Sequence, residues 1–227
     1  MVNDDRAYDE LRTGFTAAVS HELRTPLARI LVLLDSAELP GADVQALIAQ
    51  ARVEVEDAGV LIDEILFLSE LESGREVVAL GHTTALPVLE DVLGGFEDAA
   101  ARAGVLLAAE GDPTVDLPLR PRMLRIIAEN LAENAIRYAG HGARFTFGVA
   151  RAGDVAVLTA ADDGVGVTGQ ARQRLFERFY RADAARTTRG TGLGLSIVKH
   201  IVVAAGGDIE ADGGPGEGLR IRATFPG

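Results

Sequence analysis

The sequence contains no cysteine, no tryptophan and a single lysine, Lys199. Without cysteine, the chain has no disulfide, no thiolate metal site and no cysteine nucleophile. Aromatic residues make up only 5% of the chain and the net charge is -12. Both features argue against base stacking and phosphate-backbone binding, so we expect no nucleic-acid partner. Any chemistry that requires an ammonium group must use Lys199 or do without it.

Long apolar runs are also missing. No run approaches the ~18 residues of a membrane span, and no signal peptide opens the chain. The hydrophobic and charged fractions, 48% and 25%, are typical of a globular protein. The length of 227 residues predicts one or two domains, at roughly 100–200 residues per domain.

Two long helices are predicted before residue 74. The first carries an apolar stripe at helical spacing, formed by Phe15, Val19, Leu23, Leu27, Ile30 and Leu34. The second, after a turn at Pro40-Gly41, carries a heptad seam formed by Val44, Ile48, Ala51, Val55, Ala58, Ile62 and Ile65. Leu47, Leu61 and Leu68 widen this seam beyond what one partner helix can cover. We therefore expect a homodimer that forms a four-helix bundle; the alternative is packing of the hairpin on the rest of the chain.

The pattern changes after Glu72-Ser73-Gly74, which has the composition of a linker. Periodicity predicts helices over 84–102, 120–139 and 193–205. It predicts strands over 105–109, 145–149, 155–160 and 219–225. This mixed order predicts an α+β sandwich with helices on one face of the sheet. The expected domains are therefore a helical hairpin, 1–74, and a sandwich domain, 75–227.

His21 lies on the polar side of the first predicted helix, about 165° from the apolar stripe. A solvent-facing imidazole among small neighbours is an accessible nucleophile, and Glu22 can orient its far ring nitrogen. Pro26, one turn later, should kink the helix at a cost of about 3 kcal/mol, which calls for a reason. The alternative is an ordinary surface histidine.

Three further segments have the composition of a nucleotide site. Asn130 and Asn134 share one helix face, where amide oxygens suit a hard cation and amide nitrogens can donate to phosphate. Asp162-Asp163-Gly164-Val165-Gly166 follows a strand, and a carboxylate there can accept from an adenine amine. The glycines of 190–195 open a helix, where backbone N–H groups can face phosphate. The absence of a following βαβ unit excludes a dinucleotide-binding fold.

These segments resemble the conserved boxes of sensor histidine kinases, in the order found in that family. Residues 15–27 resemble the H-box, 130–138 the N-box, 162–166 the G1 box, 175–181 the F-box and 190–195 the G2 box. The resemblance runs over nearly the whole chain. It implies a dimeric phosphoacceptor hairpin followed by the ATP-binding sandwich that gyrase-type and Hsp90-type ATPases share.

The resemblance also implies roles for individual residues. His21 is expected to accept the phosphoryl group, Glu22 to manage the proton on the far ring nitrogen, and Thr25 to orient water in a phosphatase reaction. Asn134 is expected to hold Mg²⁺, Asn130 to order the phosphates and Asp162 to bind adenine. The other expected ATP-binding residues are Arg137, Tyr138, Gly164, Gly166, Phe176, Arg178, Gly190, Thr191, Gly192, Leu193, Gly194 and Leu195.

The chain departs from the family pattern at two places. Arg137 stands where the N-box usually has lysine, and Leu119-Arg120-Pro121 stands where an acidic residue is common. Between the G1 and G2 boxes the sequence has six arginines: Arg172, Arg174, Arg178, Arg181, Arg186 and Arg189. The resemblance makes this segment the ATP lid, in which one or two arginines are expected to reach the γ-phosphate.

The resulting expectation is an ATP- and Mg²⁺-dependent protein-histidine kinase that passes its phosphoryl group to an aspartate of a partner response regulator. The chain is expected to be the cytoplasmic end of a larger membrane sensor, attached to the membrane only through segments that this sequence does not contain. Two alternatives remain: an ATPase built on the same sandwich, and an inactive scaffold that dimerises and binds a regulator.

Overall fold

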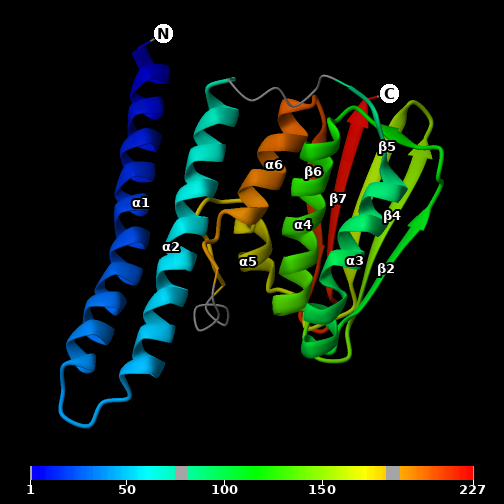
Figure 1. Ribbon diagram of the computed structural model, residues 1–227. Coiled ribbons are helices and arrows are strands. Elements are labelled where there is room, and N and C mark those ends of the chain that lie inside the picture. Colours follow the sequence, from blue (N-terminus) through cyan, green and yellow to red (C-terminus); the bar gives the residue numbers. More distant parts are fainter. Residues whose placement is uncertain (1, 75–80, 183–189, 227) are drawn as a thin grey trace. The chain divides into compact units, whose positions relative to one another are not determined.

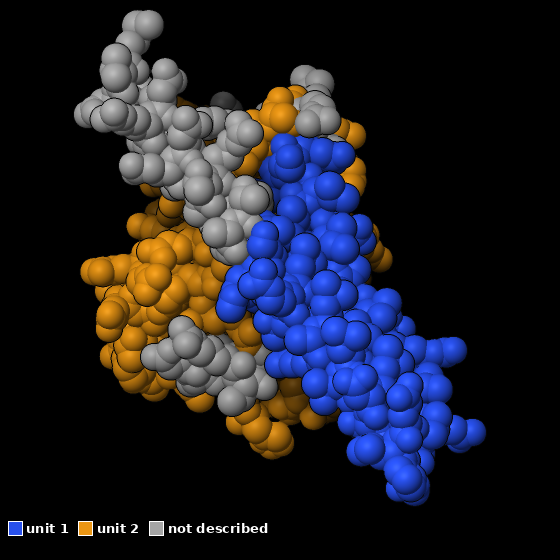
Figure 2. Space-filling view, turned by 90° about the vertical axis from the view of Figure 1, so that its left-hand side faces the viewer, with its two compact units in different colours: residues 1–70 blue, residues 71–227 orange. Residues whose placement is uncertain are grey.

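The computed structural model describes residues 2–74, 81–182 and 190–226, with side chains from residue 19 onward. The chain divides into two compact units, Met1–Glu70 and Leu71–Gly227, which Figure 2 colours separately and which we describe one at a time. The domain boundary predicted between residues 74 and 75 adjoins residues 75–80, which lie outside the described residues.

The first unit is a hairpin of two long helices, α1 (Val2–Ala37) and α2 (Val44–Glu72), which lie side by side in Figure 1. The predicted helical hairpin is therefore confirmed. Gly41 takes a positive φ of 83° in the turn, which is why a glycine stands there. The Asp43 carboxylate accepts from the N–H of Ala46 at 3.1 Å and so caps the first turn of α2.

Large apolar side chains remain exposed along both helices. They are 44–63% exposed: Leu27, Leu31, Val32 and Leu34 on α1, and Val44, Ile48, Val55, Val60, Ile62 and Leu66 on α2. Four of the seven predicted seam residues are in this group, whereas Ala51 is buried. A single hairpin thus leaves much of its apolar surface in contact with water. Burial of this surface would contribute a free energy of about 25 cal/mol per Å².

The second unit contains a five-stranded sheet in the order β2-β4-β5-β7-β6. The strands are β2 (Leu106–Gly111), β4 (Arg144–Ala152), β5 (Val155–Asp162), β6 (Asp208–Gly213) and β7 (Leu219–Pro226). Strands β2 and β4 are parallel, and the other neighbours are antiparallel. A separate two-stranded ladder joins β1 (Thr83–Thr84) to β3 (Asp116–Leu117).

Three helices, α3 (Ala85–Ala103), α4 (Pro121–Tyr138) and α6 (Gly194–Ala204), lie on the same side of this sheet in Figure 1. The short helix α5 spans Gly169–Arg174. Alternate strand residues such as Phe147, Leu158 and Phe225 are fully buried, as are Leu124 and Ile127 of α4. The predicted α+β sandwich with helices on one sheet face is confirmed.

Candidate functional site: a nucleotide pocket and an exposed histidine

His21 is exposed in the middle of α1, as its helical phase predicts. Glu22 beside it is half-buried, and Thr25, one turn further on, is exposed. The Thr25 hydroxyl donates to the carbonyl oxygen of His21 at 3.3 Å. Pro26 lies inside the helix and has no N–H to give to the carbonyl of Glu22. The segment therefore presents an imidazole and a hydroxyl to solvent where the helix ladder is interrupted.

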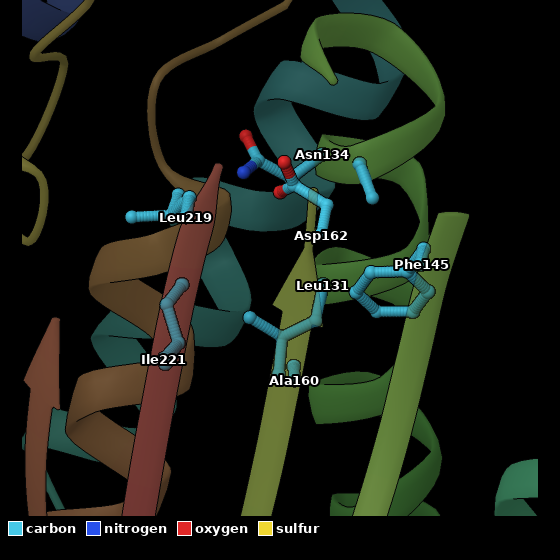
Figure 3. Close-up of a pocket in the computed structure, with 8 residues that line it drawn as sticks. Leu131, Asn134, Phe145, Ala160, Asp162, Leu219 and Ile221 are labelled. Atoms are coloured by element: carbon cyan, nitrogen blue, oxygen red, sulfur yellow. The ribbon is translucent and has the colours of Figure 1, made fainter. Parts of the chain in front are cut away.

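A small pocket lies between α4 and the sheet of the second unit and encloses about 200 Å³ when the adjoining open solvent is included. Its lining consists of Leu131, Asn134, Ala135, Phe145, Ala160, Asp162, Leu219 and Ile221. Figure 3 shows the Asn134 amide and the Asp162 carboxylate close together at one end, with apolar side chains below them. The pocket thus combines an apolar slot with two polar groups, which suits a flat heterocycle that carries an amine.

Asp162 ends β5, and its carboxylate is half-buried. Burial raises the pKa of this carboxyl, while hydrogen bonds from the N–H groups of Gly164 and Leu219 oppose the shift. The Gly164 N–H lies 3.0 Å from Oδ1. A half-buried acceptor with two fixed backbone donors is oriented before any ligand arrives.

The glycines after Asp162 allow close backbone packing. A Cβ on Gly164 would lie 2.0 Å from the carbonyl oxygen of Ala139, at the end of α4. Gly166 has a φ of 65°, and a Cβ there would lie 1.9 Å from the carbonyl oxygen of Gly214. No side chain larger than hydrogen fits at either position, so the loop 162–166 can be formed only with glycine there.

The predicted N-box and G2 segments, about sixty residues apart, lie together. A Cβ on Gly194 would lie 2.4 Å from Oδ1 of Asn130, whose Nδ2 donates to the carbonyl of Ile126 at 2.8 Å. A Cβ on Gly190 would lie 3.1 Å from Nη1 of Arg137 and 3.3 Å from the Tyr138 hydroxyl. The three polar side chains of α4 therefore face the glycine segment 190–194, which leads into α6.

The G2 segment is also tied to the F-box. Gly192, with a φ of 73°, accepts from the N–H of Phe179 at 3.0 Å. Phe179 itself has a φ of 59°, which is uncommon for a bulky residue. The Lys199 ammonium of α6 lies 5.8 Å from the ring centroid of Phe176.

Leu193 is fully buried, and its N–H donates to the Thr191 hydroxyl at 3.2 Å, whereas Leu195 is half-buried. The Phe179–Gly192 hydrogen bond and the contact of Lys199 with Phe176 join residues 175–180 to the G2 segment and α6.

The described arginines of this segment have different surroundings. Arg172 pairs with Asp212 at 2.9 Å. Arg174 pairs with Glu177 at 2.8 Å and lies over the ring of Tyr180. Arg178 is exposed, and Arg186 and Arg189 lie outside the described residues, so the expected lid arginines stay a prediction.

Sequence reasoning missed two parts of the site. It did not identify the apolar lining residues Leu131, Phe145, Leu219 and Ile221 as ligand contacts. It also missed the turn 213–218, which packs on the loop 162–166. The run Gly213-Gly214-Pro215-Gly216-Glu217-Gly218 was the signal available, because four closely spaced glycines indicate tight backbone contact.

The donor set fits a nucleotide better than a metal alone. Within 19–74, 81–182 and 190–226, no group of three or more His, Asp or Glu residues is arranged to hold a metal ion. Mg²⁺ usually takes one or two protein oxygens and completes its shell with water and substrate phosphates. The Asn134 amide oxygen, at the edge of the pocket, fits that mode.

Two sequence-family models match the chain. Residues 11–74 match the His Kinase A (phospho-acceptor) domain, and residues 120–227 match the histidine kinase-, DNA gyrase B- and HSP90-like ATPase family. The chain belongs to the sensor histidine kinases of two-component systems.

Among curated relatives, the chain is 32% identical over 218 residues to the sensor protein IrlS of Burkholderia pseudomallei. The aligned region covers 93% of this chain and 45% of IrlS. The chain spans about half the length of the curated relatives it matches.

Two solved structures are similar. Full-length ShkA in complex with AMPPNP is 27% identical, with a TM-score of 0.67 over 92% of this chain and 45% of that one. Histidine kinase ThkA in complex with the response regulator protein TrrA is 18% identical, with a TM-score of 0.75 over 97% of this chain and 63% of that one. Among the described helices, none is long and apolar enough to span a membrane.

Proposed function

We propose that the chain is an ATP-dependent protein-histidine kinase that phosphorylates His21. The observation that carries this proposal is the coexistence of an exposed histidine in a matched phosphoacceptor segment and a pocket that joins Asn134 to Asp162. The complex of ShkA with AMPPNP supports an adenine nucleotide as the ligand.

In the proposed nucleotide complex, the Asp162 carboxylate accepts from the adenine amine and the apolar lining covers the ring. Asn134 holds Mg²⁺ through its amide oxygen, and Asn130 and the N–H groups at the start of α6 order the phosphates. The ion, when bound, supplies positive charge that offsets the phosphate oxygens. The side chains therefore act by positioning and electrostatics.

In the proposed reaction, one ring nitrogen of His21 attacks the γ-phosphorus in line. A nitrogen–phosphorus bond forms, the bond from phosphorus to the β,γ-bridging oxygen breaks, and ADP leaves with that oxygen. Glu22 accepts or stabilises the proton on the far ring nitrogen. The phosphoryl group then passes to an aspartate of a response regulator, as the complex of ThkA with TrrA supports.

We further propose that the hairpin forms a homodimer, because ten large apolar residues on α1 and α2 are exposed in the single chain. A second hairpin would remove them from water in a four-helix bundle. A phosphatase reaction is the finer proposal, with the exposed Thr25 hydroxyl orienting water one turn from His21.

The test of the kinase is incubation with γ-labelled ATP and Mg²⁺. We expect an acid-labile, base-stable label on the unsubstituted chain and none on His21→Gln. His82→Gln is the matched control, since His82 is also exposed and should leave labelling unchanged. Steady phosphate release without labelled protein would favour an ATPase. The absence of both phosphate release and labelled protein would favour a scaffold. Label that persists in His21→Gln would refute His21 as the acceptor.

A further inference from the structure

The glycine-rich turn between β6 and β7, residues 213–218, lies directly against the loop that carries Asp162. The N–H of Gly218 donates to the carbonyl of Gly164 at 3.1 Å, and that of Gly216 to the carbonyl of Val165 at 2.8 Å. A Cβ on Gly218 would lie 1.9 Å from the carbonyl oxygen of Asp162. Because backbone meets backbone with no side chain between, a movement of the turn must move the loop.

The turn also reaches the carboxylate of Asp162. The N–H of Gly164 donates to this carboxylate at 3.0 Å, and the backbone N–H of Leu219, the residue after the turn, acts with it to lower the pKa of the carboxyl. Gly164 belongs to the loop, which the turn contacts through two backbone hydrogen bonds, and Leu219 directly follows the turn, so the direction of the carboxylate depends on where the turn lies.

Arg172 of α5 holds the start of this turn. Its Nη1 donates both to Oδ1 of Asp212 and to the carbonyl of Gly213, at 2.9 Å each. The same Asp212 oxygen accepts from the N–H of Gly213 at 2.8 Å. Arg172 is thus bound to the turn by one side-chain and one backbone acceptor, and both bonds come from a single nitrogen.

We propose that Arg172 is a positioning residue for base recognition: it fixes the turn 213–218 against the loop 162–166 and so aims the Asp162 carboxylate. Arg172 makes no contact with the nucleotide in this role, which differs from the γ-phosphate contact expected for the lid arginines. The inference rests on the proposed ATP-binding function and specifies how the selectivity for adenine is maintained.

The test is calorimetric titration of the whole chain with ATP, ADP and GTP in the presence of Mg²⁺. Arg172→Ala should weaken ATP and ADP by the same factor, about three- to tenfold, as expected for the loss of one or two hydrogen bonds. GTP binding should change less, so the preference for ATP over GTP should shrink. Arg172→Lys should restore the preference, because one ammonium nitrogen can make both bonds.

Arg222→Ala is the matched control. Arg222 pairs with Glu210 at 3.1 Å across the same two strands but does not contact residues 213–218 in any described hydrogen bond. It should leave all three affinities unchanged. Asp212→Asn removes the same ion pair by changing the carboxylate partner. It replaces Arg172→Ala in the test if thermal unfolding shows that Arg172→Ala does not fold. It should reduce the preference for ATP over GTP in the same way.

Three results would overturn the role of Arg172. A loss of ATP affinity with ADP unaffected would indicate a direct γ-phosphate contact. If Arg172→Ala left the affinities unchanged, or if Arg172→Lys failed to restore the preference for ATP over GTP, a tether through one nitrogen would be excluded. An equal loss in Arg222→Ala would indicate general damage to the strand pair. If the unsubstituted chain bound no adenine nucleotide, the proposed function itself would fail, and the variants would not be needed to show it.

Discussion

Replacing Gly194 by alanine is expected to lower autophosphorylation strongly while leaving the stability of the fold nearly unchanged. The added Cβ would lie 2.4 Å from Oδ1 of Asn130, whereas a carbon–oxygen contact needs about 3.3 Å. The Asn130 amide must therefore move by about 1 Å. A displacement of that size in a positioning group can cost about 10²-fold in rate, or about 2.7 kcal/mol of transition-state stabilisation.

The stability terms nearly cancel. Gly194 is the first residue of α6 and its φ is not in the left-handed region, so alanine gains about 0.4–1 kcal/mol through the unfolded state. Movement of Asn130 gives up its hydrogen bond to the carbonyl of Ile126, worth about 0.5–1.5 kcal/mol. The net change should stay within about 1 kcal/mol, which corresponds to about 2–4 °C in the unfolding midpoint.

The assay is the initial rate of labelling by γ-labelled ATP, measured beside thermal unfolding. Gly95→Ala is the control, because Gly95 lies inside α3 with no heavy atom within 4 Å of the added Cβ. It should raise the free energy of unfolding by about 0.5–1 kcal/mol at full activity. Full activity of Gly194→Ala would refute the positioning role of Asn130. A fall of 10 °C or more in the Gly194→Ala midpoint would instead mean that the clash is not absorbed by the amide.

Three further outcomes are expected. Asp162→Asn should abolish nucleotide binding in calorimetry yet raise the unfolding midpoint at neutral pH. Burial raises the carboxyl pKa of Asp162, so the folded chain holds that proton more tightly than the unfolded chain does. The free energy of unfolding therefore falls as the pH rises from the ordinary carboxyl pKa through the raised pKa, and Asp162→Asn should lose this pH dependence. Thr25→Ala should slow dephosphorylation of a partner regulator while sparing autophosphorylation; an unchanged dephosphorylation rate would end that proposal. Ile48→Asp, at a position 45% exposed, should shift the chain toward monomer in analytical ultracentrifugation, and a persistent dimer would place the interface elsewhere.

Periodicity predicted the long elements because their buried faces are strongly apolar. In α4, Met123, Leu124, Ile127, Leu131 and Ala135 are buried at helical spacing, and in β7 alternate residues are buried. The same signal is weak where an element has little to bury. Strand β6 offers only Ile209 and Ala211 between acidic residues, and α5 buries only Ala171, so neither was predicted.

The site shows a similar division. The box motifs identified residues that the fold does bring together, such as Asn130 with the first residue of α6 and Asn134 with Asp162. Motifs could not identify the apolar lining, because Leu219 and Ile221 have the same residue types as any buried strand. They could not identify the tether of Arg172 to Gly213 either, since it joins residues 41 apart through a backbone oxygen.

Arg137 stands where the family pattern has lysine, and its contacts show what a guanidinium allows at this position. Its Nη2 pairs with Glu133 one turn earlier at 3.2 Å, while Nη1 lies against Gly190 at the start of the G2 segment. A lysine at this position, as in the family pattern, would offer one nitrogen to both the carboxylate and a phosphate. A guanidinium has five donors in a fixed plane, so it can keep Glu133 on one side and present the other to the glycine segment. Arginine at position 137 is therefore compatible with the phosphate contact predicted there, and Glu133 sets the plane in which that contact would form.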